Sequence, residues 1–128
     1  AAGQGKIAHA ARDDQARAAA AALASGSTVS RTYTLTGPQA LTTDETAKIA
    51  SKALGKPISV VHVSAEQLAG GMAAVGVPAP VIPLFVSFDV NTAQDRLSDV
   101  TGDIEALTGK APQSLTDWFK SNKAMFGA

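Results

Sequence analysis

Polar and apolar residues change their spacing along the chain in a way that predicts short strands alternating with helices. Residues 32–36 alternate threonine with larger side chains, which is typical of a strand, and a glycine–proline pair then ends the extended segment. Thr42 and Glu45 stand three positions apart, as in a capping box, so a helix is expected to begin there. Gly55 is expected to end it. This order of strand, turn and capped helix indicates one unit of an α/β fold.

A similar unit precedes this one. Residues 6–10 predict a short strand, and Asp13 or Asp14 is expected to cap the following helix, because a carboxylate favours the positive helix N-terminus. The helix is expected to run to Ala24 and to stop near Gly26. Its buried stripe is predicted to consist of Ala16, Ala19, Ala20 and Leu23.

The remaining chain predicts more helix than strand. Residues 58–63 are mostly apolar, as in a strand buried on both faces, and Ser64 with Gln67 forms a second capping box. The helices expected after it cover residues 64–76, 81–90 and 103–107, with one more beginning at Ser114. Residues 91–101 are polar and predict irregular structure. The last helix is expected to bury Leu115, Trp118, Phe119 and Met125.

Composition narrows the class of protein. A chain of 128 residues with 45% hydrophobic residues predicts one domain with a real core, here residues 1–128. The net charge is zero, which gives no electrostatic footprint for nucleic acid or for an anionic membrane, and no apolar run is long enough to span a bilayer. No cysteine is present, which excludes disulfides and thiolate chemistry. The first residues do not resemble a signal peptide, so cytoplasm is the expected location.

The chain offers few groups for catalysis. Tyr33 is the only tyrosine, but position 37 is glycine, so the Tyr-x-x-x-Lys pair of many dehydrogenases is absent and Tyr33 is interpreted as a core or edge residue. His9 and His62 have no neighbouring ligand set, so no metal site is expected. Asp13 and Asp14 are explained by helix capping. No catalytic residue is therefore assigned.

Four motifs, in register along nearly the whole chain, resemble one family. They are the Arg-Asp-Asp-x-Ala stretch at 12–16, Tyr-x-Leu-Thr-Gly-Pro at 33–38, Val-Gly-Val-Pro at 75–78, and Thr-Gly-Lys-x-Pro with Ser-Leu at 108–115. The chain thereby resembles the C-terminal, substrate-side part of NmrA-like atypical short-chain dehydrogenases of the NAD(P)H:quinone oxidoreductase type. Gln15 departs from the apolar residue usual in that family.

The resemblance implies an α/β fold, the C-terminal portion of a Rossmann-like NAD(P)-binding fold, with few short strands, about five helices and a helix-rich C-terminal half. The Gly-x-x-Gly-x-x-Gly loop of the family is absent, since Gly3 and Gly5 follow no strand and precede no helix N-terminus that would hold a pyrophosphate. A six-stranded doubly wound sheet needs roughly 200 residues, so a chain of 128 residues resembles the second half of such an enzyme. NADP or NAD is therefore expected in the full-length family, and none is expected to bind this chain alone.

The family also suggests a substrate surface. Its relatives place the helix after the Val-Gly-Val-Pro step over the active-site crevice, which makes Phe85, Phe88 and Asp89 candidate substrate-binding residues. The two rings share a helix face and suit a flat, quinone-like molecule. The alternative, that both phenylalanines belong to the core, is favoured by the residues alone.

Two functions from different classes remain at this point. The chain is either the substrate side of an NAD(P)H-dependent reductase of quinone-like or carbonyl acceptors, inactive alone, or a non-catalytic binding or self-association module. The expected partner is a missing N-terminal half or a second copy of the chain. Uncovered apolar faces and unpaired strand edges predict a homo-oligomer.

Overall fold

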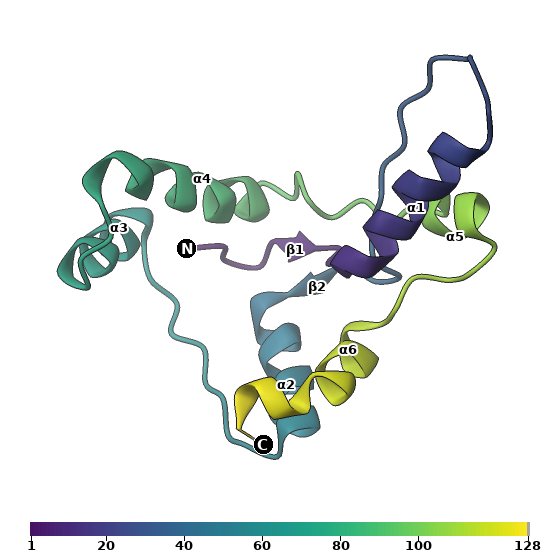
Figure 1. The fold of residues 1–128 in the computed structure, drawn as a ribbon. Coiled ribbons are helices and arrows are strands. Elements are labelled where there is room, and N and C mark those ends of the chain that lie inside the picture. Colours follow the sequence, from purple (N-terminus) through teal and green to yellow (C-terminus); the bar gives the residue numbers. More distant parts are fainter. Residues whose placement is uncertain (128) are drawn as a thin grey trace.

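The computed structural model describes residues 1–127, which form three pairs of helices around a minimal sheet (Figure 1). The elements in order are β1 (Lys6–Ile7), α1 (Arg12–Ala24), β2 (Leu41–Thr42), α2 (Thr43–Leu54), α3 (Ala65–Ala74), the 3-10 turn η1 (Ala79–Val81), α4 (Ile82–Ala93), α5 (Asp103–Thr108), α6 (Leu115–Ser121) and the 3-10 turn η2 (Lys123–Phe126). The fold is α/β and helix-rich, as expected, with six α-helices rather than about five.

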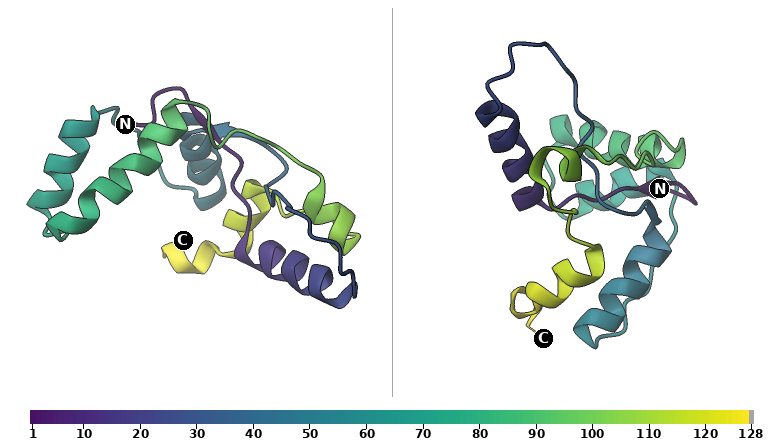
Figure 2. Two further views of the ribbon diagram at one scale, coloured as in Figure 1. Left: turned by 90° about the horizontal axis from the view of Figure 1, so that it is seen from above. Right: turned by 90° about the vertical axis from the view of Figure 1, so that its right-hand side faces the viewer.

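The sheet joins distant parts of the chain at the centre of the molecule. β1 and β2 run antiparallel, with Lys6 opposite Thr42 and Ile7 opposite Leu41, and Ile7 also forms a parallel bridge with Leu97. Around this centre α1 packs on α5, α2 on α6 and α3 on α4, and both views in Figure 2 show the three pairs pointing in different directions. The pairs therefore share little core with one another.

The predicted capping boxes and the predicted end of the second helix are confirmed by the hydrogen bonds and backbone angles. The Thr42 Oγ1 accepts from the Glu45 N–H at 3.1 Å, and the Glu45 carboxylate accepts from the Thr42 N–H at 2.9 Å. Ser64 and Gln67 make the same reciprocal pair at the start of α3. Gly55 takes a left-handed conformation with φ 69° at the end of α2, where a side chain would be strained.

The two predicted strands at residues 32–36 and 58–63 are wrong for the described chain, where neither segment carries a β-ladder. A strand requires a hydrogen-bonded neighbour, and residues 1–127 supply none to either segment. The first segment is instead held from the side, since the Thr34 N–H donates to the Asp103 carboxylate at 2.7 Å and the Thr101 N–H donates to the Thr36 hydroxyl at 2.9 Å. The strand expected over residues 6–10 shortens to β1.

The first helix also differs from its prediction. It begins at Arg12 after Ala11, which has no capping side chain, so neither aspartate is the N-cap. The expected buried stripe faces outward, with Leu23 85% exposed, and the buried face carries Asp14 and Ala18 against α5. Alanine occupies both faces of this helix, so hydrophobic spacing alone did not identify the packed one.

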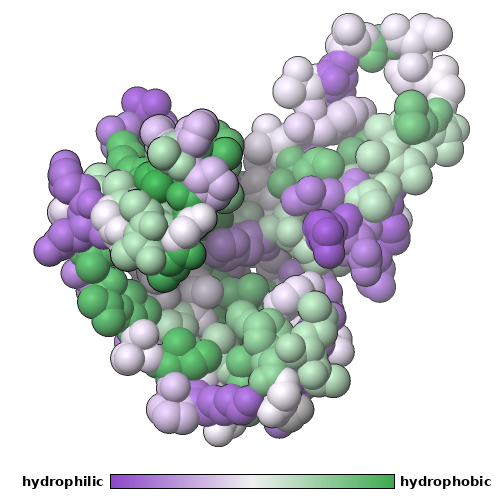
Figure 3. Space-filling model, turned by 60° about the vertical axis from the view of Figure 1, so that its left-hand side comes forward, coloured by the Kyte–Doolittle hydropathy of each residue, from purple (hydrophilic) through white to green (hydrophobic). Residues whose placement is uncertain are grey.

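Apolar surface remains uncovered over much of the molecule. The fully buried apolar residues are few and mostly small, with Ile104 the largest, whereas Val61, Val75, Phe88 and Met125 are among the exposed ones. The space-filling view shows hydrophobic patches over the α3–α4 face (Figure 3). Burial of Met125 was predicted and is wrong, since the residue is 74% exposed. Among residues 1–127, no helix combines the length and hydrophobicity that crossing a bilayer requires.

Candidate functional site

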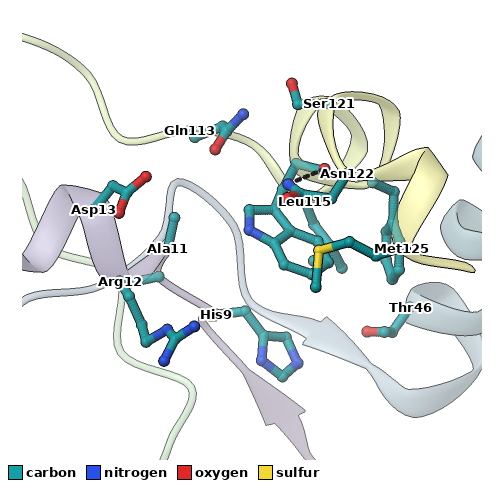
Figure 4. Close-up of a pocket in the computed structure, with 13 residues that line it drawn as sticks. His9, Ala11, Arg12, Asp13, Thr46, Gln113, Leu115, Ser121, Asn122 and Met125 are labelled. Carbon is teal, nitrogen blue, oxygen red and sulfur yellow. Dashed lines mark hydrogen bonds between the residues drawn. The ribbon is translucent and has the colours of Figure 1, made fainter.

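A cavity of about 650 Å³ lies between the segment after β1, the first turn of α1, and the C-terminal helix α6 (Figure 4). This volume is in the range of pockets that take small molecules. Residues from four parts of the chain line it, because the β1–β2 pairing brings the start of α1 next to α2 and α6 packs on α2. The hollow is large enough to admit a small molecule.

One wall of the cavity is aromatic and apolar. Trp118 and Phe119 of α6 meet edge to face with ring centroids 5.3 Å apart, and Phe126 packs 6.3 Å from the Trp118 ring behind them. Leu115 and Met125 complete this wall (Figure 4). Edge-to-face pairs are a favourable aromatic geometry, so these contacts stabilise the orientation of the Trp118 ring at the cavity.

The opposite wall is polar and carries charges without partners. Arg12 and Asp13 both line the cavity, and within residues 1–127 neither side chain forms a hydrogen bond or an ion pair. Across the cavity from them, beside Met125, the buried Thr46 hydroxyl lacks a hydrogen-bond partner in the same part of the chain (Figure 4). Figure 4 shows the Arg12 side chain on the His9 side of the cavity and the Asp13 carboxylate turned the other way, towards Gln113. Polar groups and apolar surface therefore converge on one hollow.

The start of α1 is fixed beside the cavity by a buried carboxylate. Asp14 is 2% exposed, forms an ion pair with Arg17, and accepts a hydrogen bond of 2.7 Å from the Gln113 N–H. Gln113 belongs to the segment that leads into α6. Asp14 therefore ties the two sides of the cavity mouth together, although the sequence was interpreted as giving it a capping role.

Partial burial lowers the pKa of His9 below its ordinary value, because the cavity wall disfavours the charged imidazole. The unfolded chain then binds more protons than the folded chain between the lowered pKa and about 6.5, the ordinary value for histidine. The free energy of unfolding is therefore expected to fall as pH drops through about 6.5 and to level off below the lowered pKa.

This pH dependence is measured by urea unfolding at a series of pH values, for the wild type and for His9→Gln. The substitution removes the titrating ring, so the acid-side loss of stability should be smaller in the variant. An identical pH dependence in both proteins would contradict a lowered pKa at His9.

The residues predicted to bind substrate lie elsewhere. Phe85 and Phe88 sit on α4 with ring centroids 6.4 Å apart, 45% and 51% exposed, so they share a helix face as expected and neither is a core residue. The Asp89 carboxylate lies 2.7 Å from the N-terminal nitrogen. None of the three lines the cavity. The structure thus contains an aromatic helix face and a separate cavity.

Other candidates have structural partners. The Arg31 guanidinium lies 4.9 Å from the centroid of the half-buried Tyr33 ring. His62 Nε2 lies 3.2 Å from the Asp44 carboxylate on α2. Within residues 1–127, histidine and acidic side chains form no cluster that could hold a metal ion.

The cavity itself was missed by sequence reasoning. Trp118 and Leu115 were expected to be buried, and both are half-buried, but nothing in the local pattern placed them opposite Arg12. One signal was available: Arg12 and Asp13 open an alanine-rich helix, yet charges at a helix start usually indicate only a solvated first turn.

Comparisons with known proteins give consistent matches, although no protein-family model matches the chain. The chain is 29% identical over 126 residues to the NAD(P)H azoreductase of Xenophilus azovorans, covering 98% of the chain and 44% of that protein. It is 32% identical to the uncharacterized oxidoreductase YesF of Bacillus subtilis, covering 97% of the chain and 43% of that protein.

Solved structures agree with these sequence matches. A crystal structure of the NADPH-dependent quinone oxidoreductase QOR2 from Escherichia coli superposes with a TM-score of 0.87 at 29% identity, covering 98% of the chain and 45% of that structure. The expected fold, the C-terminal portion of a Rossmann-like NAD(P)-binding reductase, is confirmed. The chain spans less than half the length of each of these relatives.

Proposed function

From the similarity of this chain to the C-terminal part of NmrA-like NAD(P)H:quinone oxidoreductases, we propose that it forms the substrate side of an NAD(P)H-dependent oxidoreductase. The observation that carries the proposal is the superposition of 98% of the chain on the E. coli quinone oxidoreductase with a TM-score of 0.87. The proposed reaction is transfer of hydride from NADPH or NADH to a quinone-like or carbonyl acceptor. The task of these residues is to position the acceptor, since the cofactor carries the chemistry.

The residues present do not fit a dinucleotide. Gly5 is the nearest glycine to a phosphate loop, but its Cα faces the Thr92 carbonyl so closely that an added Cβ would lie 1.8 Å from that oxygen. The space a pyrophosphate would need beside this glycine is filled by protein, and no helix begins there. The cofactor site is therefore proposed to lie in another part of the protein, an N-terminal half that precedes these residues.

Two surfaces support such a partner. The outward face of α1, with Leu23 85% exposed, presents alanines and a leucine to no other element of the described chain. Residues 32–36 likewise present backbone groups without a ladder partner in that part of the chain. Contact with further protein would cover both surfaces, so we propose that the chain belongs to a homo-oligomer or to a longer protein. The proposed location is the cytoplasm.

The acceptor is proposed to contact the exposed aromatic face of α4. Phe85 and Phe88 are exposed enough to stack on a planar ring, and Asp89 follows on the same helix. The alternative function, a non-catalytic binding or self-association module, is not favoured by the matches to reductases. It would gain support if a longer protein oligomerised but reduced no acceptor.

Cofactor oxidation tests the proposal directly. The coding sequence is read upstream of the codon for Ala1, and the protein it encodes is expressed together with the 128-residue chain. The longer protein is expected to oxidise NADPH or NADH only when a quinone is added, and the chain alone is expected to bind neither cofactor. A longer protein that binds NADPH but reduces no quinone or carbonyl acceptor, or tight NADPH binding by the chain alone, would overturn the proposal.

A further inference from the structure

The cavity between α1 and α6 joins an aromatic wall to a cation that has no partner. The Trp118 ring is held by Phe119 and Phe126, so a planar ligand stacked on it would replace water on an apolar face without reorganising the wall. Leu115 and Met125 extend this surface. The volume, about 650 Å³, admits a fused ring system with a substituent.

The polar wall favours an anion. The Arg12 guanidinium is exposed and, within residues 1–127, forms no ion pair, unlike Arg17, which pairs with Asp14. The cavity also touches the first turn of α1, where Ala11 offers no capping side chain, and this helix end adds positive potential. The Asp13 carboxylate is offset by the same helix end and points away from Arg12 (Figure 4).

We propose that this cavity binds a planar aromatic molecule that carries an anionic substituent, with the ring against Trp118 and the anion at Arg12. Binding of such an anionic aromatic molecule to the cavity does not require reductase activity.

Binding is measured on the 128-residue chain by calorimetry, without cofactor, using a naphthalenesulfonate, its neutral sulfonamide and naphthylmethylammonium. The sulfonate is expected to bind about tenfold more tightly than the sulfonamide, as one charge-assisted interaction allows. Trp118 is the only tryptophan, so its single indole N–H signal in the NMR spectrum reports whether the ligand occupies this cavity.

Two arginine variants test the role of the cation. Arg12→Gln is expected to reduce the preference for the sulfonate about tenfold, to near equality, while leaving helix content by circular dichroism unchanged. Arg96→Gln removes the same charge from an exposed site outside the cavity, and it should keep the preference.

Several results would overturn this inference. They are no binding of the sulfonate, equal affinity for sulfonate and sulfonamide in the wild type, tighter binding of the ammonium compound, an unmoved indole signal, or a preference that survives Arg12→Gln. None of these results bears on cofactor oxidation by the longer protein, so failure of this inference and failure of the proposed function are separable.

Discussion

Replacing Gly37 with alanine is expected to lower the free energy of unfolding by about 3 kcal/mol or more. A Cβ at this position would lie 1.9 Å from the His9 carbonyl oxygen and 2.8 Å from its carbonyl carbon. Both atoms belong to the backbone, so no side chain can turn aside to relieve the overlap. Gly37 is buried and its N–H donates to the Ala8 carbonyl at 3.2 Å, so the two segments would have to separate.

The damage should extend to the cavity, because His9 lines it and the segment after β1 would be displaced. The measurements are the urea midpoint and the position of the Trp118 indole signal. Gly70→Ala is the matched control, since its Cβ would meet nothing within 4 Å and α3 continues through it. Alanine is the better helix former, so this control should be neutral or stabilising by up to about 1 kcal/mol. A wild-type midpoint for Gly37→Ala would show that the close approach is absent.

Elements whose causes are local could be predicted from the sequence. Both capping boxes occur as expected, because Thr42 and Glu45, or Ser64 and Gln67, satisfy each other's backbone groups within a single turn. Gly55 ended its helix for an equally local reason. The family resemblance was also confirmed, since it depended on motifs that are continuous in sequence.

Elements that depend on distant partners could not be predicted in the same way. Residues 32–36 have the composition of a strand, yet strand pairing needs a neighbour that residues 1–127 do not provide. The α1 helix has small apolar residues on both faces, so the choice between them is made by α5. The cavity required Arg12 and Trp118, near opposite ends of the chain, to meet across the β1–β2 pairing.

Replacing Asp14 with alanine is expected to cost about 2–3 kcal/mol of unfolding free energy, close to the value for losing a hydrogen-bonded buried charge. The carboxylate is 2% exposed, and its loss would leave the Gln113 N–H without the acceptor it now reaches at 2.7 Å. Arg17 limits the cost, because its side chain is 44% exposed and remains hydrated after its partner is removed. Urea unfolding monitored by circular dichroism measures the change.

Asp13→Ala is the matched control, because it removes the same charge from the same helix turn at an exposed carboxylate with no hydrogen bond or ion pair within residues 1–127. Its effect should stay within about 0.5 kcal/mol. Any loss of favourable interaction with the positive helix end is shared by both variants, so the difference between them isolates the link to Gln113. Equal effects of the two substitutions would mean that helix-end electrostatics, rather than this link, fixes α1 beside the cavity.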